Sequence, residues 1–122
     1  MKKKTTQAKV EGNIRLMAAH ARSVAESRTT TAESRIVIAV IGEDRPGIMA
    51  GVTSVLARHS ANILDVSQTI MSDLFTMVML VDIRGVKVPF STLKTGLEEH
   101  GREAGLSIIV QHEEIFKAMH RV

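Results

Sequence analysis

The stretch from Ile41 to Ile48 constrains the fold of this chain more than any other part of the sequence. Residues 35–41 before it are apolar and rich in β-branched side chains, which is typical of a β-strand. After it, apolar residues recur from Ile48 to Leu56 at the spacing of one helix face. The sequence therefore predicts a strand, a tight corner and a helix in direct succession.

The corner contains the residue types that a strand-to-helix turn needs. Gly42 can adopt dihedral angles that other residues avoid, Asp44 can accept hydrogen bonds from the N–H groups of a helix start, and Pro46 suits the first helical position. The start of a helix carries a partial positive charge, so it attracts a carboxylate or a phosphate. Such turns also occur where they bind nothing, so a purely structural role stays open. The candidate ligand-binding residues of this corner are Asp44, Arg45, Pro46, Gly47 and Ile48.

The remainder of the chain predicts three more strands and two more helices. Residues 62–72 alternate well enough for a strand, with Leu64, Val66 and Ile70 on one face, and a tight turn at Ser72 follows. Beyond this turn we predict a strand over 74–83, a helix opened by Pro89 and ended by Gly105, a strand over 106–111, and one or two helical turns over 113–121.

The element order β-α-β-β-α-β predicts the fold class. It is typical of a ferredoxin-like α+β sandwich of two layers, in which two helices cover one face of a four-stranded antiparallel sheet. The first, third and fourth strands are apolar at both alternating positions, so the second face of the sheet should be covered as well. Two covers are available, a helix near the start of the chain and a second copy of the chain. We expect both to contribute in an oligomer.

Residues 1–34 form an N-terminal region that differs in character from the domain over residues 35–122. A basic tail comes first, and apolar residues at intervals of four and three then predict an amphipathic helix over residues 8–27, followed by a linker over 28–34. This region has seven Lys and Arg against three Glu, whereas the domain has nine basic against ten acidic residues. The domain therefore has no basic surface of its own for nucleic acid. The predicted helix can pack on its own domain or on a neighbouring subunit.

Composition excludes several kinds of site. The chain has 122 residues of which 44% are hydrophobic, enough for one domain with an aliphatic core, and it has no Cys for disulfides or thiolate metal sites. The five His residues lack metal-binding spacing, and no catalytic motif, phosphate loop or membrane-spanning stretch occurs. We therefore expect a cytoplasmic protein that is not an enzyme and has no metal or cofactor.

The corner and the elements around it resemble the ACT domain family of small ligand-binding regulatory modules. The turn over residues 44–47 carries the resemblance, together with Asn62 at the start of the second strand. The similarity covers about residues 35–112 and extends to free-standing proteins made of a single ACT domain. It implies a homodimer that holds a small ligand, often an amino acid, at a subunit interface, but it names no regulated partner. The positions that match the family's ligand contacts are Asp44, Arg45, Gly47, Ile48 and Asn62.

Other interpretations of these residues are open at the level of sequence. Asn62 can simply cap the preceding helix. Acylphosphatases share the element order and use an Arg at a strand-to-helix phosphate loop with an Asn nearby, which would give Arg45 and Asn62 a hydrolytic role, although the glycine-rich loop of that family is missing here. RNA-recognition domains also share the plan, but they stack bases on sheet aromatics, and only Phe75 lies on a central predicted strand. We do not expect nucleic-acid binding.

Overall fold

A computed structural model describes residues 34–119 of the chain. The described elements confirm the predicted order, and their boundaries lie close to those expected. The predicted helix over residues 8–27 lies outside the described residues. The elements are β1 (Arg35–Glu43), α2 (Ile48–Arg58), β2 (Asn62–Met71), β3 (Leu74–Asp82), α3 (Phe90–Ala104), β4 (Ser107–His112) and α4 (Glu113–Met119).

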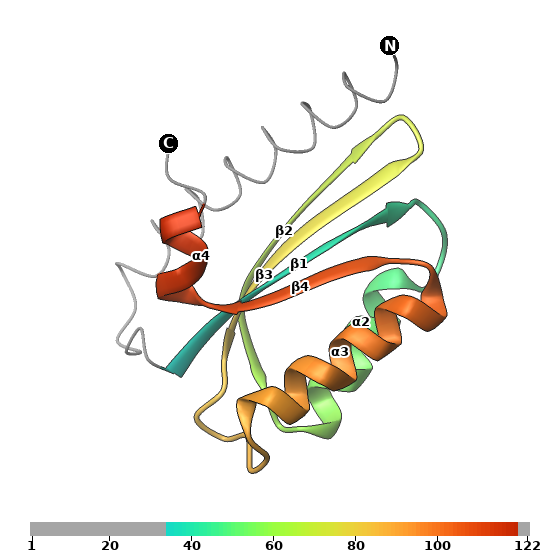
Figure 1. Cartoon of the computed structure of the whole chain (residues 1–122). Helices are drawn as coiled ribbons and strands as arrows, with labels where there is room; N and C mark the ends of the chain where they lie inside the picture. The colour runs from blue at the N-terminus through green and yellow to red at the C-terminus, as the bar shows by residue number, and fades with distance from the viewer. Residues whose placement is uncertain (1–33, 120–122) are drawn as a thin grey trace.

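The four strands form one antiparallel sheet in the order β2-β3-β1-β4 (Figure 1). Helices α2 and α3 lie side by side on one face of the sheet, and the short helix α4 lies on the other face at one end. This arrangement is the predicted ferredoxin-like α+β sandwich. The turn that follows β1 leads from the sheet to the start of α2, beside the C-terminal end of α3.

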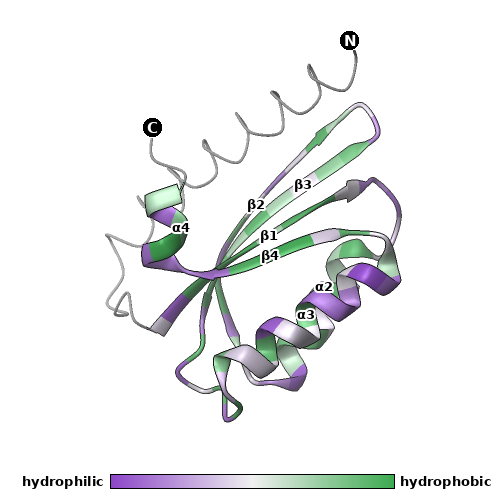
Figure 2. Cartoon of the chain, viewed as in Figure 1, coloured by the Kyte–Doolittle hydropathy of each residue, from purple (hydrophilic) through white to green (hydrophobic). Residues whose placement is uncertain are grey.

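The main hydrophobic core lies between the sheet and the helices α2 and α3. Both helices bury apolar side chains against the sheet, and the exposed side chains of α3 are polar (Figure 2). Complete burial of each aliphatic side chain contributes about 1.5–3 kcal/mol, so this layer is the main source of stability. The fully buried residues at its centre are Ile36, Ile38, Val40, Val52, Met77, Met79, Val81, Leu93 and Leu97.

A second, smaller apolar cluster lies on the opposite face of the sheet. We call this the second face. Its members come from the alternate positions of the two central strands and from Phe116 of α4. The prediction that these strands are buried on both sides is therefore confirmed for β1 and β3 but is wrong for β4, whose Ile109 on this face is 38% exposed. The buried residues of the cluster are Val37, Ala39, Val78, Leu80 and Phe116, with Ile41 and Leu64 packed against them.

Strand β2 differs from the prediction in the direction of its side chains. The sequence pattern placed Leu64 and Val66 on one face, but Val66 packs against the main core and Leu64 against the second-face cluster. The reason is a β-bulge, because Ile63 pairs with Val81 whereas Asp65 already pairs with Leu80. One extra residue in β2 shifts the alternation of the strand by one position.

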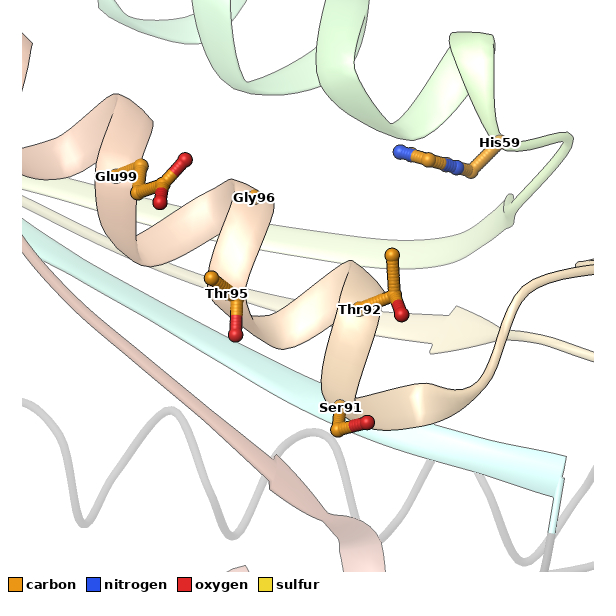
Figure 3. A pocket seen from close by; sticks show the side chains of 6 residues that line it. All are labelled: His59, Ser91, Thr92, Thr95, Gly96 and Glu99. Atoms are coloured by element: carbon orange, nitrogen blue, oxygen red, sulfur yellow. The ribbon is translucent and has the colours of Figure 1, made fainter.

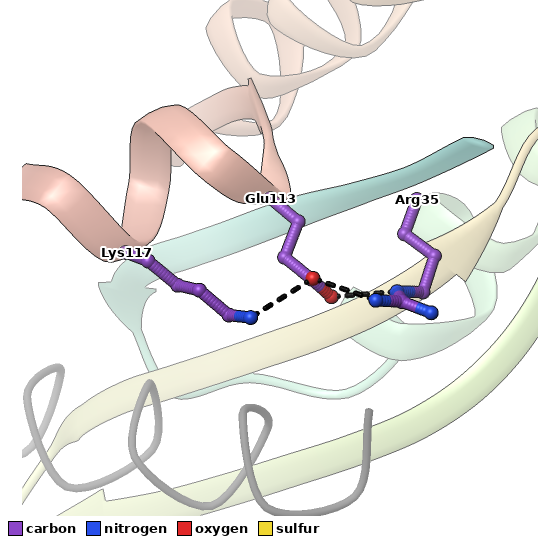
Figure 4. Close-up of polar contacts among 3 residues, drawn as sticks. All are labelled: Arg35, Glu113 and Lys117. Atoms are coloured by element: carbon purple, nitrogen blue, oxygen red, sulfur yellow. Dashed lines mark hydrogen bonds and ion pairs between the residues drawn. The ribbon is translucent and has the colours of Figure 1, made fainter. Parts of the chain in front are cut away.

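A buried ion pair fixes the start of α4 to the start of β1 (Figure 4). The guanidinium of Arg35 donates two hydrogen bonds to the carboxylate of Glu113, with Nε···Oε2 and Nη2···Oε1 distances of 2.7 and 2.9 Å. Lys117 approaches the same carboxylate from the other side, at 3.1 Å from Oε1. Burial by itself would raise the pKa of Glu113, but the hydrogen bonds and charges of Arg35 and Lys117 outweigh it and lower this pKa. The carboxylate is therefore held ionised inside the protein.

Candidate functional site

The corner between β1 and α2 has a different cap from the one expected. Gly47 occupies the N-cap position in the left-handed conformation, with φ 87°, and no described side chain caps the helix. Asp44 is therefore not the cap, and Pro46 lies in the turn before the helix rather than at its first position. A left-handed N-cap favours glycine, because other residues are strained there. The N–H groups at the start of this helix are thus not capped by a side chain in the described part of the chain.

The neighbouring strands hold the corner in place. The backbone N–H of Asp44 donates to the carbonyl oxygen of Asp73 in the β2–β3 turn, at 2.7 Å. Gly42 lies so close to Leu106 that an added Cβ would be 2.5 Å from its Cδ2 atom. The turn is therefore tied to the hairpin on one side and packed against the start of β4 on the other.

A cavity of about 300 Å³ opens at the corner, between the start of α2 and the end of α3. Arg45, Pro46, Gly47 and Ile48 line it from the turn, so the structure brings four of the predicted site residues together around one space. Asp44 is exposed next to them but does not line the cavity. The residues that line it from the other side are His100, Glu103, Ala104 and Leu106.

The contribution of α3 to this cavity was missed by the sequence reasoning. The ring of His100 packs directly against the backbone of α2, because a Cβ added to Gly51 would lie 2.7 Å from its Nε2 atom. The guanidinium of Arg45 reaches the C-terminal end of α3, within 3.6 Å of the Cβ position of Gly105. His100 and Glu103 share a helix face by their i, i+3 spacing, but only the packing of α3 beside α2 shows that this face meets the turn.

These groups have complementary charges for a small zwitterion. The helix start and Arg45 are suited to a carboxylate, since backbone N–H groups and a guanidinium both donate to anionic oxygens. Glu103 supplies a negative charge on the opposite wall. The cavity volume exceeds that of an ordinary amino acid, and its mixture of an apolar wall, at Ile48 and Leu106, with a few polar groups is typical of small-molecule sites.

Asn62 lies far from this cavity within the chain. It is the first residue of β2 and pairs with Asp82, whereas the corner follows Glu43, which pairs with Leu74 at the other end of β3. Eight residues of strand separate the two ends, or about 26 Å. Arg45 and Asn62 therefore cannot act together in one chain, and this removes the basis for the acylphosphatase comparison.

Asn62 also does not take part in the cap of the preceding helix. Backbone groups close the end of α2, since the N–H groups of His59, Ser60 and Ala61 donate to carbonyl oxygens of its last turn. Ser60 has the positive φ of 59° that such a helix end requires. The side chain of Asn62 is exposed at the edge of the sheet and remains available for another contact.

A second cavity of about 430 Å³ lies at the other end of the two long helices (Figure 3). His59 extends toward α3 from the end of α2, and residues of α3 line the other side of the cavity. It is larger than the cavity at the corner, and none of the predicted site residues lines it. Its lining residues are His59, Ser91, Thr92, Thr95, Gly96 and Glu99.

Further features of residues 34–119 bear on other functions. This part of the chain contains no cluster of three or more side chains suited to a metal ion. None of its helices has the length and apolar character needed to cross a membrane. Phe75 is buried on the face that packs against α2 and α3, so it offers no surface on which a base can stack.

The fold and the glycine turn define a ferredoxin-like domain with a cavity at the end of its first strand. The chain belongs to the ACT domain family, which it matches over residues 34–111. It is 62% identical over 89 residues to a UPF0237 protein of Methanocaldococcus jannaschii, a match that covers 73% of this chain and 99% of that protein. A UPF0237 protein of Clostridium acetobutylicum is 51% identical over 88 residues, covering 72% and 99% of the two chains.

A solved structure supports the same assignment. The ACT domain protein from Streptococcus pneumoniae is 36% identical to this chain, with a TM-score of 0.60. The superposition covers 70% of this chain and 96% of that protein. The resemblance that the sequence suggested is therefore confirmed, and the chain is similar to proteins that consist almost wholly of one ACT domain.

Proposed function

We propose that this protein is a regulatory module that binds a small molecule, an amino acid or a similar small anion, in the cavity at the β1–α2 corner. The observation that supports this most directly is the uncapped helix start, which faces a cavity with Arg45 on one wall and Glu103 on another. A carboxylate can bind the N–H groups and the guanidinium, and an ammonium group can bind Glu103 or the exposed Asp44. Membership of the ACT family adds the regulatory role.

The ligand is proposed to bind where two subunits of a homodimer meet. The position of Asn62 supports an interface site. Asn62 matches a ligand-contacting position of the family, yet it lies at the opposite end of the sheet from Gly47. A second copy can supply its Asn62 to the corner of the first, whereas a single chain cannot. A ligand shared by two subunits stabilises the dimer by mass action, which gives a physical route from binding to regulation.

A thermal-shift screen of the twenty amino acids at millimolar concentration tests this proposal. A ligand at ten times its Kd adds about 1.4 kcal/mol of stability and raises the melting temperature by roughly 5 °C for a domain of this size. Arg45→Ala should remove most of this rise. Arg58→Ala is the matched control, because Arg58 is an exposed Arg at the other end of the same helix.

Two results would count against the proposal. The first is that no amino acid raises the melting temperature, and the second is that Arg45→Ala and Arg58→Ala lower the rise equally. The ligand found in this screen would narrow the search for a regulated partner protein, because it would indicate the metabolic pathway in which that partner acts.

A further inference from the structure

The second face of the sheet is covered over a larger area than the described elements account for. Of these, only α4 lies on this face (Figure 1). Its seven residues extend about 10 Å, whereas the nine residues of β1 extend about 30 Å. α4 therefore covers the end near Arg35 and leaves the rest of the face to another cover.

The end of the second face that α4 does not reach is nevertheless buried, as Thr76 shows. Thr76 lies opposite Ile41, six residues along β1 from Arg35 and so about 20 Å from the start of α4. The side chain of Thr76 is fully buried, and its Oγ1 atom has no hydrogen-bond partner among the described residues. Val78 beside it is 2% exposed. An apolar cover with some polar groups is needed at this end of the face.

We propose that the N-terminal region of the same chain provides this cover, with the apolar side of residues 10–24 packed on the second face. The apolar residues of this segment, Val10, Ile14, Met17, Ala21 and Val24, form one stripe of a helix about 21 Å long, which matches the length left open by α4. Residues 1–34 as a whole carry an excess of basic residues, the segment itself has two Arg and one Glu, and the domain carries a slight excess of acidic residues.

The connection favours the same chain over a second copy. Ser34 directly precedes β1, and its carbonyl oxygen accepts a hydrogen bond from the N–H of Ile83 at 2.8 Å. The polypeptide therefore joins the sheet at the same end where α4 lies. The six residues 28–33 can reach about 20 Å, which is enough to place the segment over the face. The segment also lies outside the ACT match at residues 34–111. It is thus an addition that closes this face, and subunits of an oligomer then meet elsewhere.

Thiol labelling tests the proposal directly, because the chain has no Cys of its own. Ala39→Cys places a reporter on the second face, where Ala39 is 1% exposed, and Val52→Cys places a control in the main core, where Val52 is fully buried. Each reporter is combined with Ala21→Asp, on the apolar stripe of the segment, or with Ala19→Asp, which lies on the opposite side of the same predicted helix.

The proposal predicts that Ala21→Asp accelerates labelling at position 39 at least about tenfold, since a buried carboxylate opposes packing of the segment. Ala19→Asp should change the labelling rate at position 39 by less than about twofold. Labelling at position 52 should stay slow in all variants. None of these labelling rates should depend on protein concentration. If Ala21→Asp also accelerates labelling at position 52, the milder pair Ala21→Ser and Ala19→Ser is compared by the same criteria.

Three outcomes would overturn the proposal. Fast labelling of Ala39→Cys without a further substitution would show that the face is open. Equal effects of the two Asp variants at position 39 would show that the apolar stripe does not contact it. Labelling that accelerates on dilution would assign the cover to a second copy of the chain.

Discussion

Replacing Glu113 with Gln should destabilise the protein by about 3 kcal/mol at neutral pH. Glu113 is 2% exposed and Arg35 is 6% exposed, so the substitution leaves a buried guanidinium without its bidentate partner. Removal of one member of a buried pair costs about 3–5 kcal/mol. We expect the lower end of this range, because the carboxylate of Asp82 also acts on Arg35 and because Lys117 can turn to solvent.

Urea unfolding at pH 7 measures this cost. A loss of about 3 kcal/mol shifts the unfolding midpoint by roughly 2 M at a slope of about 1.5 kcal/mol/M. The neighbouring variant Glu114→Gln is the control, because Glu114 is exposed and its replacement should change stability by no more than about 0.5 kcal/mol. Equal unfolding midpoints for the two variants would refute the claim that the Arg35–Glu113 ion pair holds α4 on the sheet.

The pH dependence of the stability difference between the natural protein and Glu113→Gln provides a second check. The pKa of Glu113 in the folded protein is lowered from 4.5, so its ionised form stabilises the fold fully above that pH. This contribution is lost as the pH falls through the lower pKa of the folded state. The difference between the natural protein and Glu113→Gln should therefore be largest near neutral pH and shrink below pH 4.5. A difference that stays constant down to pH 3 would contradict the ion-pair account.

The glycines of the two long helices give two further predictions. Gly47→Ala should destabilise the protein by about 1–2 kcal/mol, because a φ of 87° strains residues other than glycine. Gly96→Ala should stabilise it by up to about 1 kcal/mol, because Gly96 lies in the middle of α3 and an added Cβ meets nothing within 4 Å. Equal melting temperatures of these two variants would contradict this reasoning. Gly101→Ala should cost about 1–3 kcal/mol in chemical denaturation, because its Cβ would lie 2.9 Å from both the carbonyl oxygen of Leu106 and the side chain of Ile108. An unchanged unfolding midpoint for Gly101→Ala would show that the contact between α3 and β4 is looser than described.

The order of elements was predictable because each element has a strong local pattern. The continuous apolar run of β1, the helix period of α2 and the glycine that ends α3 with φ 73° all depend on residues close together in the chain. The bulge in β2 was not predictable in this way. It depends on how Asp65 pairs with Leu80 in another strand, so the pattern of β2 alone could not give its position.

The candidate site could be predicted only on the side that comes from one segment. Residues 45–48 are consecutive, so their role was visible in the sequence. His100 and Glu103 are more than fifty residues away, and the packing of α3 against α2 brings them to the turn. Asn62 shows the opposite case, because its family position suggested the site while the register of β3 places it at the far end of the sheet.

Amide chemical-shift mapping with the amino acid that gives the largest thermal shift would locate the bound ligand on the protein. We expect saturating ligand to shift the backbone N–H signals of residues 47–50 most strongly, together with those around His100 and Glu103 on α3. The same titration of Arg45→Ala should leave these signals in place. Shifts confined to the cavity around His59 and Thr92, or no saturable shift at the corner, would contradict the claim that the helix start at Gly47 is the binding site.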